Sequence, residues 1–380
     1  MSTTLERPEL QSQPQAKPVT KLRMQVVESL AHVEPKVIDA WREMTENPMG
    51  SPDWLLPWWK YYGRDNDQLQ LVLFFDHEEL VSVSPLYLEN GKHLKMLGSG
   101  KVCSDHAELF IAVESWRQTV SSQFLDWLVS SDAPNWHSMQ LEAIDSFGSS
   151  SQIVSQWKDG VSVHVEEGDS ICSIPLPESW DDYLGSLSKN HRKRVRRWIR
   201  QHLDTKQVQP RCTGAGWDFD EAFECLIQLH NLRRKDMTEN GAFESEQFRE
   251  FHKEALSRLG ARGQAVICGI FLDDKPVAIE YELINDDTVF AYQSGADIDG
   301  GLNSPGSVSI LVRLQLWLSY GKKTYDLMRG DEDYKQHWGA QCVRTCNVMI
   351  WPNTLAGSIA KSKFHMKRKL RSVANRIRRQ

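Results

Sequence analysis

A dense run of ionisable side chains follows a short predicted strand late in the chain. The segment YDLMRGDEDYKQHWG spans residues 325–339, and its first four residues predict a β-strand. The residues that follow combine a guanidinium, three carboxylates, a phenol, an amine, an imidazole and an indole. Such groups can exchange protons with a substrate or bind an anion. The structural alternative is a salt-bridge network of Arg329, Asp331 and Lys335 that pins the loop.

A second candidate lies in GGLNSPGSVSILVRLQLWL, residues 300–318, where the pattern predicts the start of a helix. Ser304 is placed to cap the helix and Pro305 suits its first position. Orphan N–H donors and the positive end of the helix dipole make such a start an anion site, formed here by Ser304, Gly306, Ser307 and Val308. A merely well-capped helix is the alternative. The helix precedes the charged run, so we expect both at the same end of one sheet, where ligands tend to bind.

Two carboxylates alternate along a predicted strand. In VAIEYELI, residues 277–284, Glu280 and Glu282 are two positions apart and therefore share one face. That face points to solvent by default, but Glu282 could serve as a general base if the face lines a cleft. His230 and Arg233 come late in a predicted helix, where the dipole alone favours basic side chains.

The net charge of −6 conceals a strong segregation of charge. Residues 189–200 hold seven Lys and Arg, residues 361–380 hold nine, and neither segment contains an acid. The rest of the chain keeps 29 basic against 51 acidic residues, which gives it a charge of −22. Two basic segments on an acidic body indicate local contacts with anions and argue against a general coating of nucleic acid.

The first basic segment predicts a helix that starts after Ser188 and has apolar positions from Val195 to His202 on one face. Arg192 and Arg196 fall mainly on the other face. A solvated helix face is one interpretation. However, the absence of acids leaves like charges repelling without i,i+4 pairing, and this cost favours an anionic partner.

The second basic segment, KSKFHMKRKLRSVANRIRRQ, places Met366, Leu370, Val373 and Ile377 on one stripe of a helix. Such a helix could lie on acidic lipid, bind nucleic acid, or pack on the acidic body of its own chain. The sequence leaves these three possibilities open.

Two stretches share one order of elements. Residues 69–88 and residues 265–284 are each two apolar runs around a polar turn, which predicts a hairpin. Each leads to a third strand that ends in a Ser-Gly step, then to a helix and a returning strand, at residues 138–144 and 323–328. This weak internal repeat predicts two α/β units of one topology, although hairpin-rich domains can resemble one another by chance. Helices predicted at residues 33–46, 52–62, 217–235 and 243–260 complete the two units.

Length and composition fit two α/β domains of a soluble protein. We expect a disordered tail over residues 1–20, an N-terminal unit over 21–170, a C-terminal unit over 171–352 and a basic helix over 353–380. The chain lacks a signal-peptide h-region and an 18-residue apolar run, so we expect a cytoplasmic protein. A peripheral contact with the inner face of the membrane through residues 361–380 is left open.

The seven cysteines are scattered and include no C-x-x-C pair, which argues against a disulfide framework or a zinc cluster. Cys342 and Cys346 lie four apart in a predicted strand. We expect them to share one face as buried, reduced thiols.

Residues 187–340 resemble the GNAT-type acyltransferases associated with bacterial cellulose and exopolysaccharide synthesis, often called CelD-like. The likeness lies in LSKNHRKRVRR, LHNLRR, PVAIEY, SPGS and above all YDLMRGDEDYKQHW. SPDWLLPWW, PLYL and LGSGKVCSDH are similar to the N-terminal portion of that family, so the resemblance covers most of residues 50–340. A more distant likeness is to the Fem-type peptidoglycan aminoacyltransferases, whose aromatic-Lys-x-x-aromatic-Gly signature is similar to Tyr334-Lys335-x-x-Trp338-Gly339.

The resemblance implies tandem GNAT-like units with mixed, largely antiparallel sheets, flanking helices and the basic C-terminal helix in addition. It also implies direct acyl transfer from acyl-CoA, usually acetyl-CoA, with no metal. Of the usual GNAT pyrophosphate loop, Q/R-x-x-G-x-G/A, only Gly306 remains.

In such a transfer a carboxylate takes a proton from the nucleophile, a cation or N–H donors stabilise the oxyanion, and an acid protonates the thiolate. The resemblance implies these roles for Asp331, Lys335 and Tyr334, respectively, with Glu282 as a further catalytic candidate. The donor would contact Ser304, Gly306, Ser307 and Val308. The acceptor would contact Arg192, Arg196, His230, Arg233, Tyr292, Arg329 and Trp338.

The leading prediction is an N- or O-acyltransferase that acts on an amine or hydroxyl of a small molecule or of an envelope or exopolysaccharide precursor. Its nearest enzyme alternative is Fem-type aminoacyl transfer from tRNA, which the two basic helices motivate. A non-catalytic GNAT-like module that binds a polyanion is the third, because the Gly-rich loop is lost.

Overall fold

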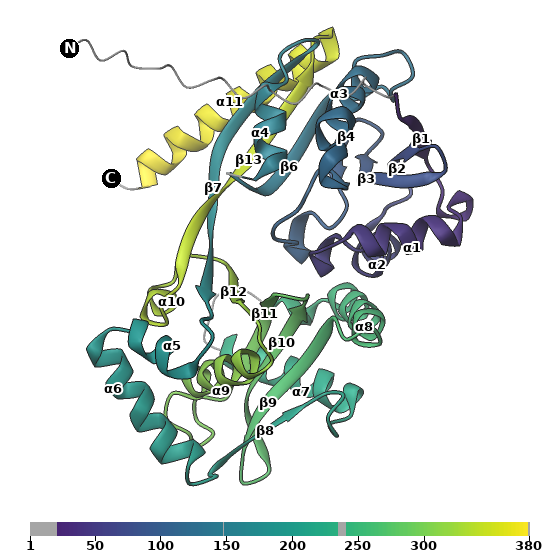
Figure 1. Ribbon diagram of the computed structural model, residues 1–380. Coiled ribbons are helices and arrows are strands. Elements are labelled where there is room, and N and C mark those ends of the chain that lie inside the picture. Colours follow the sequence, from purple (N-terminus) through teal and green to yellow (C-terminus); the bar gives the residue numbers. More distant parts are fainter. Residues whose placement is uncertain (1–20, 147, 235–240, 379–380) are drawn as a thin grey trace, which may run out of the picture.

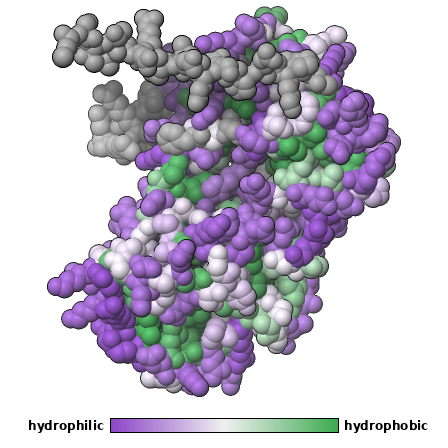
Figure 2. Space-filling view, in the orientation of Figure 1, coloured by the Kyte–Doolittle hydropathy of each residue, from purple (hydrophilic) through white to green (hydrophobic). Residues whose placement is uncertain are grey.

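Two lobes share one continuous sheet (Figure 1). The computed structural model describes residues 21–146, 148–234 and 241–378, so the tail predicted over residues 1–20 lies outside it. Strands β7 (Val161–Pro175) and β13 (Gln341–Pro352) are antiparallel partners that run from one lobe to the other. Hydrophilic side chains cover much of both lobes on the face seen in Figure 2, with smaller hydrophobic areas between them.

The N-terminal lobe surrounds a mixed sheet. Its other strands are β1 (Arg23–Val27), β2 (Gln68–Asp76), β3 (Glu79–Glu89), β4 (His93–Met96), β5 (Ile111–Ala112) and β6 (Ser138–Asp145). Its helices are α1 (Pro35–Met44), α2 (Pro52–Tyr62), α3 (Arg117–Leu128) and α4 (Ser149–Gln156). The final helix, α11 (Leu355–Arg378), also packs on this lobe, against β13 and β6.

The C-terminal lobe repeats this plan. Its other strands are β8 (Val208–Cys212), β9 (Ala265–Leu272), β10 (Lys275–Ile284), β11 (Thr288–Ala296) and β12 (Thr324–Arg329). Its helices are α5 (Trp180–Ser186), α6 (Lys189–Trp198), α7 (Phe219–Arg234), α8 (Glu246–Gly260), α9 (Pro305–Ser319) and α10 (Asp333–His337).

The predicted internal repeat is confirmed as a repeat of topology. The strand order is β1-β2-β3-β4-β6-β13-β7-β12-β11-β10-β9-β8, with β5 beside β3. In the first lobe the hairpin β2-β3 leads to β4, α3 and β6, and β4 and β6 are parallel. In the second lobe the hairpin β9-β10 leads to β11, α9 and β12, and β11 and β12 are parallel. The predicted fold class, tandem GNAT-like α/β units, is therefore confirmed.

The predicted helices are confirmed within a few residues of their expected ends. Helix α6 also starts as expected, because the Ser188 hydroxyl accepts a hydrogen bond from the His191 N–H at 3.3 Å. On α6, Val195 and Trp198 are buried while Arg196 is exposed. The amphipathic pattern read from the sequence thus places this helix correctly, with its basic face outward.

The lobes meet in a buried aromatic cluster. Trp54 of α2 packs edge-on against Phe251 of α8 and Tyr292 of β11, with ring centroids 5.0 and 5.2 Å apart. The Tyr292 hydroxyl donates to the carbonyl of Val102 in the N-terminal lobe. Complete burial lowers the pKa of His252, which packs in the same cluster, well below its usual value. The cluster joins the two lobes through a shared core.

One of the two domain boundaries predicted in the folded part of the chain falls within a strand, and the other falls at the end of a strand. The boundary expected between residues 170 and 171 falls inside β7. The boundary expected after residue 352 coincides with the end of β13, and α11 begins three residues later. Since β13 pairs with β6 from Thr345 onward, this C-terminal strand completes the sheet of the N-terminal lobe.

The expectation of unpaired cysteines is wrong. Cys172 is disulfide-bonded to Cys342, and Cys212 to Cys268, while Cys103, Cys225 and Cys346 are free. Each bonded pair sits at directly opposite positions of two antiparallel strands, β7 with β13 and β8 with β9. The partners are 170 and 56 residues apart in sequence, so spacing along the chain gave no sign of them. Only Cys346 is the buried thiol that was expected.

A search of the described residues finds no helix with the length and apolar character that crossing a bilayer requires.

Candidate active site

The candidate site lies where two parallel strands separate. Strands β11 and β12 pair from Thr288 and Thr324 to Phe290 and Asp326, and their pairing stops there although both strands continue. A cavity of about 320 Å³ opens beyond the last pair, against the start of α9. Beyond Phe290, β11 forms no further ladder pair with β12 in the described part of the chain, so backbone groups of β11 face the cavity along this edge, although the Ser294 carbonyl accepts a hydrogen bond from His230.

Residues from five elements and from the loop before α9 line this cavity. One wall is apolar and the rest carries hydroxyl and carboxyl groups. The lining residues are Glu280, Ala291, Ser294, Gly295, Ala296, Ile298, Ser304, Pro305, Gly306, Ser307, Ile310, Tyr325, Leu327 and Tyr334. A mostly apolar pocket with a few convergent polar groups is typical of a small-molecule site.

The start of α9 is organised by the backbone. Ser304 is the N-cap residue, as predicted, but its side chain does not cap: its hydroxyl donates to the Asn303 side chain at 3.1 Å. Its backbone is left-handed, with φ 58°, which is uncommon for a residue with a side chain. In that conformation its carbonyl accepts the N–H groups of Ser307 and Val308 at 3.0 and 3.1 Å.

Gly306 is therefore the donor that α9 offers to the cavity. Pro305 has no N–H, and the next two N–H groups already bond the Ser304 carbonyl. A Cβ built on Gly306 meets nothing within 4 Å, so a ligand can approach this backbone directly. Val308, predicted as part of the same anion site, is fully buried on the inner side of the helix and does not line the cavity.

Glu280 and Tyr334 supply the acid–base groups of the cavity. Glu280 comes from β10 and is 7% exposed. Tyr334 comes from α10 and is 40% exposed, at the rim. A carboxylate and a phenol on the walls of one mostly apolar cavity can take a proton from one group and give a proton to another.

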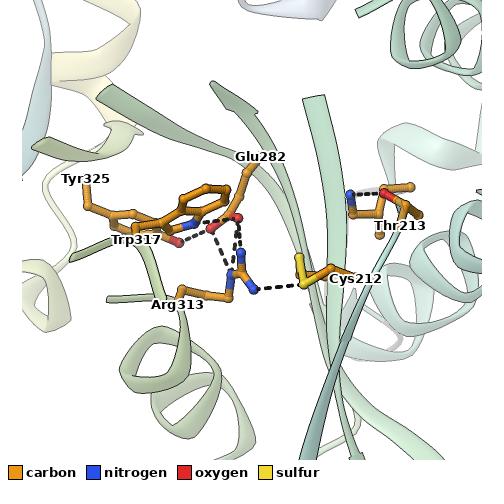
Figure 3. Close-up of a disulfide and its surroundings, with 8 residues drawn as sticks. Cys212, Thr213, Glu282, Arg313, Trp317 and Tyr325 are labelled. Carbon is orange, nitrogen blue, oxygen red and sulfur yellow. Dashed lines mark hydrogen bonds and ion pairs between the residues drawn. A yellow bond between two sulfur atoms is a disulfide. The ribbon is translucent and has the colours of Figure 1, made fainter. Parts of the chain in front are cut away.

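Glu282, two residues further along β10, has a different environment (Figure 3). Its carboxylate is fully buried and forms an ion pair with Arg313 of α9, with the closest N···O distance 2.5 Å. It also accepts the Trp317 indole N–H at 2.9 Å and the Tyr325 hydroxyl at 2.8 Å. Burial and the Glu282 charge raise the pKa of Tyr325 well above its usual value. Glu282 thus fastens α9 to the sheet and does not line the cavity, so the structure does not support its predicted role as a base.

Lys335 is likewise engaged in architecture. Its ammonium is 2% exposed and donates to the carbonyls of Met328, Arg329 and Gly330 at 3.0–3.1 Å, with an ion pair to Glu332 at 3.0 Å. These partners engage its donors in the turn between β12 and α10, and Lys335 is not among the residues that line the cavity. Asp331 has an exposed side chain outside the cavity lining, and its catalytic role stays a prediction.

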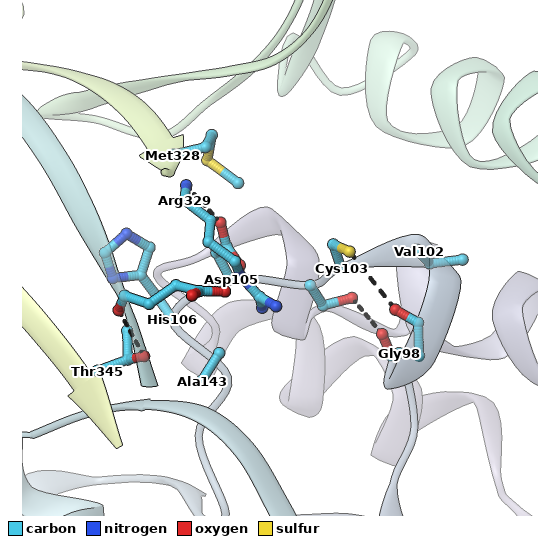
Figure 4. A network of polar contacts seen from close by, with 12 residues as sticks. Gly98, Val102, Cys103, Asp105, His106, Ala143, Met328, Arg329 and Thr345 are labelled. Atoms are coloured by element: carbon cyan, nitrogen blue, oxygen red, sulfur yellow. Dashed lines mark hydrogen bonds and ion pairs between the residues drawn. The ribbon is translucent and has the colours of Figure 1, made fainter. Parts of the chain in front are cut away.

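The end of β12 is clamped by the N-terminal lobe (Figure 4). The Arg329 guanidinium forms an ion pair with the buried Asp105 carboxylate at 2.6 Å, which also accepts the Arg329 backbone N–H at 2.9 Å. His106 contacts the Asp326 carboxylate at 2.9 Å. The other oxygen of that carboxylate accepts the N–H of Met328, whose φ of 59° is unusual for a residue with a side chain.

Burial lowers the pKa of His106, but the hydrogen bond and negative charge of Asp326 outweigh this effect and raise the pKa above its usual value. Arg329, predicted to bind substrate, is thus an inter-lobe contact. The structure replaces the predicted network of Arg329, Asp331 and Lys335 with two separate ones, one between lobes and one within a turn.

The remaining predicted substrate contacts also lie outside the cavity lining. Tyr292 is buried between the lobes, as described above. Trp338 is buried against Trp198 and His191, with the His191 ring 4.7 Å away. His230 lies behind the cavity, where its Nδ1–H donates to the Ser294 carbonyl at 3.1 Å.

Helix α7 packs so closely there that a Cβ on Gly295 would lie 2.5 Å from the backbone nitrogen of His230, which explains why this position is a glycine. Arg192 is partly exposed and Arg196 exposed on α6, and neither lines the cavity. The Arg233 side chain lies outside the described residues.

Of the predicted site residues, Tyr334, Ser304, Gly306 and Ser307 therefore converge on one cavity. The carboxylate that joins them is Glu280, which sequence reasoning identified as half of an acidic pair but did not choose. Strand alternation could place both carboxylates on one face. Only the position of Arg313, 31 residues from Glu282, decides which carboxylate is neutralised. Among the described residues, no group of three or more His, Cys, Asp or Glu is arranged to hold a metal ion.

Comparison with known proteins agrees with this placement. Residues 189–336 match the family described as "Acetyltransferase (GNAT) domain", and this span contains every residue that lines the cavity. No curated protein sequence matches the chain significantly.

Solved structures show the fold over both lobes. A crystal structure of FemX is similar at a TM-score of 0.59 and 10% identity, over 83% of this chain and 96% of that one. A conserved protein from Bacteroides thetaiotaomicron VPI-5482 is similar at 0.51 and 12% identity, over 87% of this chain and all of that one. L-PGS from Bacillus licheniformis is similar at 0.51 and 10% identity, over 86% and 95%. The chain thus matches a GNAT acetyltransferase domain over residues 189–336 and shares its two-lobed fold with distant proteins.

Proposed function

We propose that the protein transfers an acyl group, in the first instance acetyl, from acyl-CoA to an amine or hydroxyl in the cavity of the C-terminal lobe. The observation that carries this proposal is the convergence of Gly306 N–H, the open edge of β11, Glu280 and Tyr334 on one cavity. The match of residues 189–336 to a GNAT acetyltransferase domain supports the same reaction class.

The donor fits the cavity through its polar backbone groups. The pantetheine arm of CoA is an extended chain with two amides, and it can pair with the open edge of β11 as a strand would. The pyrophosphate then approaches the start of α9, where the Gly306 N–H and the helix dipole favour negative charge.

The chemistry requires two proton transfers. As the acceptor nitrogen or oxygen attacks the thioester carbonyl, Glu280 takes the proton that the nucleophile loses. When the tetrahedral intermediate collapses, the C–S bond breaks and Tyr334 donates its proton to the departing thiolate. General acid–base contributions of this kind amount to ~100-fold or more each. Buried apolar lining such as Leu327 limits the water that competes with the acceptor.

A pair of glycine variants tests the donor site. In Gly306→Val, branched bulk covers the exposed N–H, so affinity for acetyl-CoA in isothermal titration should fall at least about tenfold, the cost of one charge-assisted hydrogen bond. Gly185→Val in α5 is the matched control, because Gly185 is also a helical glycine with nothing within 4 Å of an added Cβ and lies away from the cavity. Equal affinity of both variants and the wild type would place the donor elsewhere.

The acceptor class rests on the resemblance of residues 325–339 to CelD-like enzymes. We propose an amine or hydroxyl of an envelope or exopolysaccharide precursor. Single-turnover loss of the thioester with such acceptors, compared with its loss in their absence, tests the assignment.

Aminoacyl transfer from tRNA is a second candidate, favoured by one specific feature. A groove of about 640 Å³, lined by Arg197, Arg200 and Gln201 on one side and Asn303 on the other, lies next to the start of α9. An anionic strand in this groove would lead directly to the cavity. The similarity of the fold to that of FemX is compatible with this candidate. Micromolar binding of aminoacyl-tRNA that weakens steeply with salt, together with no binding of CoA, would select it.

A further inference from the structure

The outer face of α11 carries four exposed apolar side chains along one stripe. Leu355, Ile359, Met366 and Leu370 are 80%, 48%, 58% and 63% exposed. At 100° per residue these four positions fall within about 60° of one another around the helix. They account for a third of the exposed large hydrophobic side chains in the described part of the chain, yet all lie on one helix face.

The opposite face of α11 is held firmly against the N-terminal lobe. The Phe364 ring packs on Trp351 of β13 with centroids 5.3 Å apart. Arg368 contacts His164 and Glu166 of β7 at 2.6 and 3.2 Å. A Cβ on Gly357 would lie 2.1 Å from the Pro352 carbonyl oxygen, so this helix turn has no room to rotate. The stripe therefore cannot turn inward without breaking these contacts.

Lysines flank the stripe on both sides. Lys363 and Lys367 follow one edge of the stripe on the helix wheel and Lys369 follows the other. The helix contains no acidic residue, although the rest of the chain is strongly acidic. An apolar stripe with lysines on both of its edges is the pattern of a helix that lies in the interface of an anionic membrane. A contact with another acidic protein surface would not need an exposed apolar stripe of this length.

A groove beside α11 adds a place for an anionic group. It measures about 540 Å³ and is lined by Lys92, His93, Lys363, Lys367, Trp351 and Phe364, among others. Lys92 belongs to the turn between β3 and β4, so the groove brings ammonium groups from two elements together over an aromatic floor. Within the described residues, no salt bridge involves Lys92, Lys363 or Lys367, the three lysines of the groove.

We propose that α11 docks the protein on an anionic lipid surface, with the stripe of Leu355, Ile359, Met366 and Leu370 entering the acyl boundary and the groove taking a lipid phosphate. The docking face lies on the N-terminal lobe, whereas the catalytic cavity lies in the other lobe (Figure 1). Strand β13, which separates them, has 12 residues and is about 40 Å long. The helix therefore locates the enzyme and does not deliver a membrane lipid into the cavity directly.

Vesicle co-sedimentation tests this proposal without any activity assay. The full-length protein is mixed with vesicles of phosphatidylcholine alone or of phosphatidylcholine with about a third of phosphatidylglycerol. Near an anionic membrane surface, each lysine raises the affinity for the membrane about fivefold. We expect binding to the anionic vesicles that weakens with salt, and much weaker binding to the neutral ones.

Two variants separate the apolar and charged contributions. Ile359→Ser/Met366→Ser/Leu370→Ser should reduce binding to anionic vesicles at least about 100-fold, because three apolar side chains leave the interface. Tyr320→Ser, at a side chain 70% exposed on the other lobe, is its control and should bind as the wild type does. Lys363→Gln/Lys367→Gln/Lys369→Gln should remove the preference for phosphatidylglycerol. Lys189→Gln/Lys193→Gln/Lys206→Gln removes the same charge from exposed positions of the C-terminal lobe and should retain it.

Three results would overturn the proposal. Equal and weak binding of the wild type to both kinds of vesicle excludes an anionic membrane. A wild-type dimer in analytical ultracentrifugation that becomes a monomer in the Ser variant means that a second copy covers the stripe. Salt-dependent binding to an RNA hairpin that is lost in the α11 lysine variant, with no vesicle binding, assigns the helix to nucleic acid.

Discussion

Substitution of the two glutamates of β10, Glu280 and Glu282, should affect catalysis in one case and stability in the other. Glu280 lines the cavity, whereas Glu282 is buried in the ion pair with Arg313. The change to glutamine removes the charge and keeps the shape of each side chain. We expect Glu280→Gln to lower turnover and leave stability nearly intact, and Glu282→Gln to do the reverse.

The size of each effect follows from the contacts. Glu282→Gln leaves the Arg313 guanidinium, 1% exposed, without a counter-charge. Removal of one partner of a buried pair costs about 3–5 kcal/mol, which corresponds to a drop in Tm of about 4–6 °C for a chain of this size. The hydrogen bonds from Trp317 and Tyr325 add to this cost if the new amide nitrogen faces them. Glu280→Gln sits at a cavity wall and should cost about 1 kcal/mol or less, but it removes a proton acceptor worth ~100-fold in turnover.

Thermal unfolding and single-turnover thioester loss, measured on the same preparations, give both readouts. The double variant Glu282→Gln/Arg313→Met is the control: since no buried charge is left unpaired, it should unfold at a higher temperature than Glu282→Gln alone. The reasoning is refuted if Glu282→Gln keeps the wild-type Tm and loses turnover, because Glu282 would then be the base. A fully active Glu280→Gln enzyme would leave the cavity without its proposed base.

Three further outcomes follow from other contacts. Lys335→Met should destabilise the protein by about 2–3 kcal/mol, because three carbonyls lose a charged donor, and chemical denaturation measures this; a stability loss under 0.5 kcal/mol would return Lys335 to the candidate catalytic groups. The pKa of His106 is raised in the folded state, so the His106–Asp326 contact contributes stability that is fully present below the unfolded pKa and is lost as pH rises through the folded pKa. The stability difference between wild type and His106→Asn should therefore grow from pH 8 to pH 5.5, and a constant difference contradicts the assignment. Alkylation of the protein unfolded without reductant should label three cysteines, and labelling of all seven would show that neither disulfide forms.

Local patterns in the sequence predicted the fold well. Hairpins, helix caps and amphipathic faces depend on residues within a few positions of each other, and the order of these elements repeats in the two lobes. The start of α9 was predicted for the same reason, since Ser304, Pro305 and Gly306 are neighbours. Its left-handed Ser304 was not, because nothing local requires it.

The inter-lobe contacts and the disulfides, which the sequence did not predict, depend on partners far along the chain. Asp105 and His106 contact Arg329 and Asp326 across 224 and 220 residues. The two disulfides join strands that become neighbours only when the sheet forms. The ionisable side chains near one strand end thus looked like one catalytic group, whereas a long-range ion pair engages Arg329 and local bonds within the turn engage Lys335.

That architecture bears on catalysis through the end of β12. Tyr325 and Leu327 line the cavity. Asp326, which lies between them, and Arg329, at the end of the strand, are held by His106 and Asp105 of the N-terminal lobe. The separation of β12 from β11, which creates the cavity, is therefore stabilised in part by contacts from the N-terminal lobe. A C-terminal lobe without its partner would lose both inter-lobe ion pairs and the β13–β6 pairing, and the pairing of β12 with β7 would then carry more of this task. The N-terminal lobe thus maintains the shape of the cavity even though none of its residues lines it.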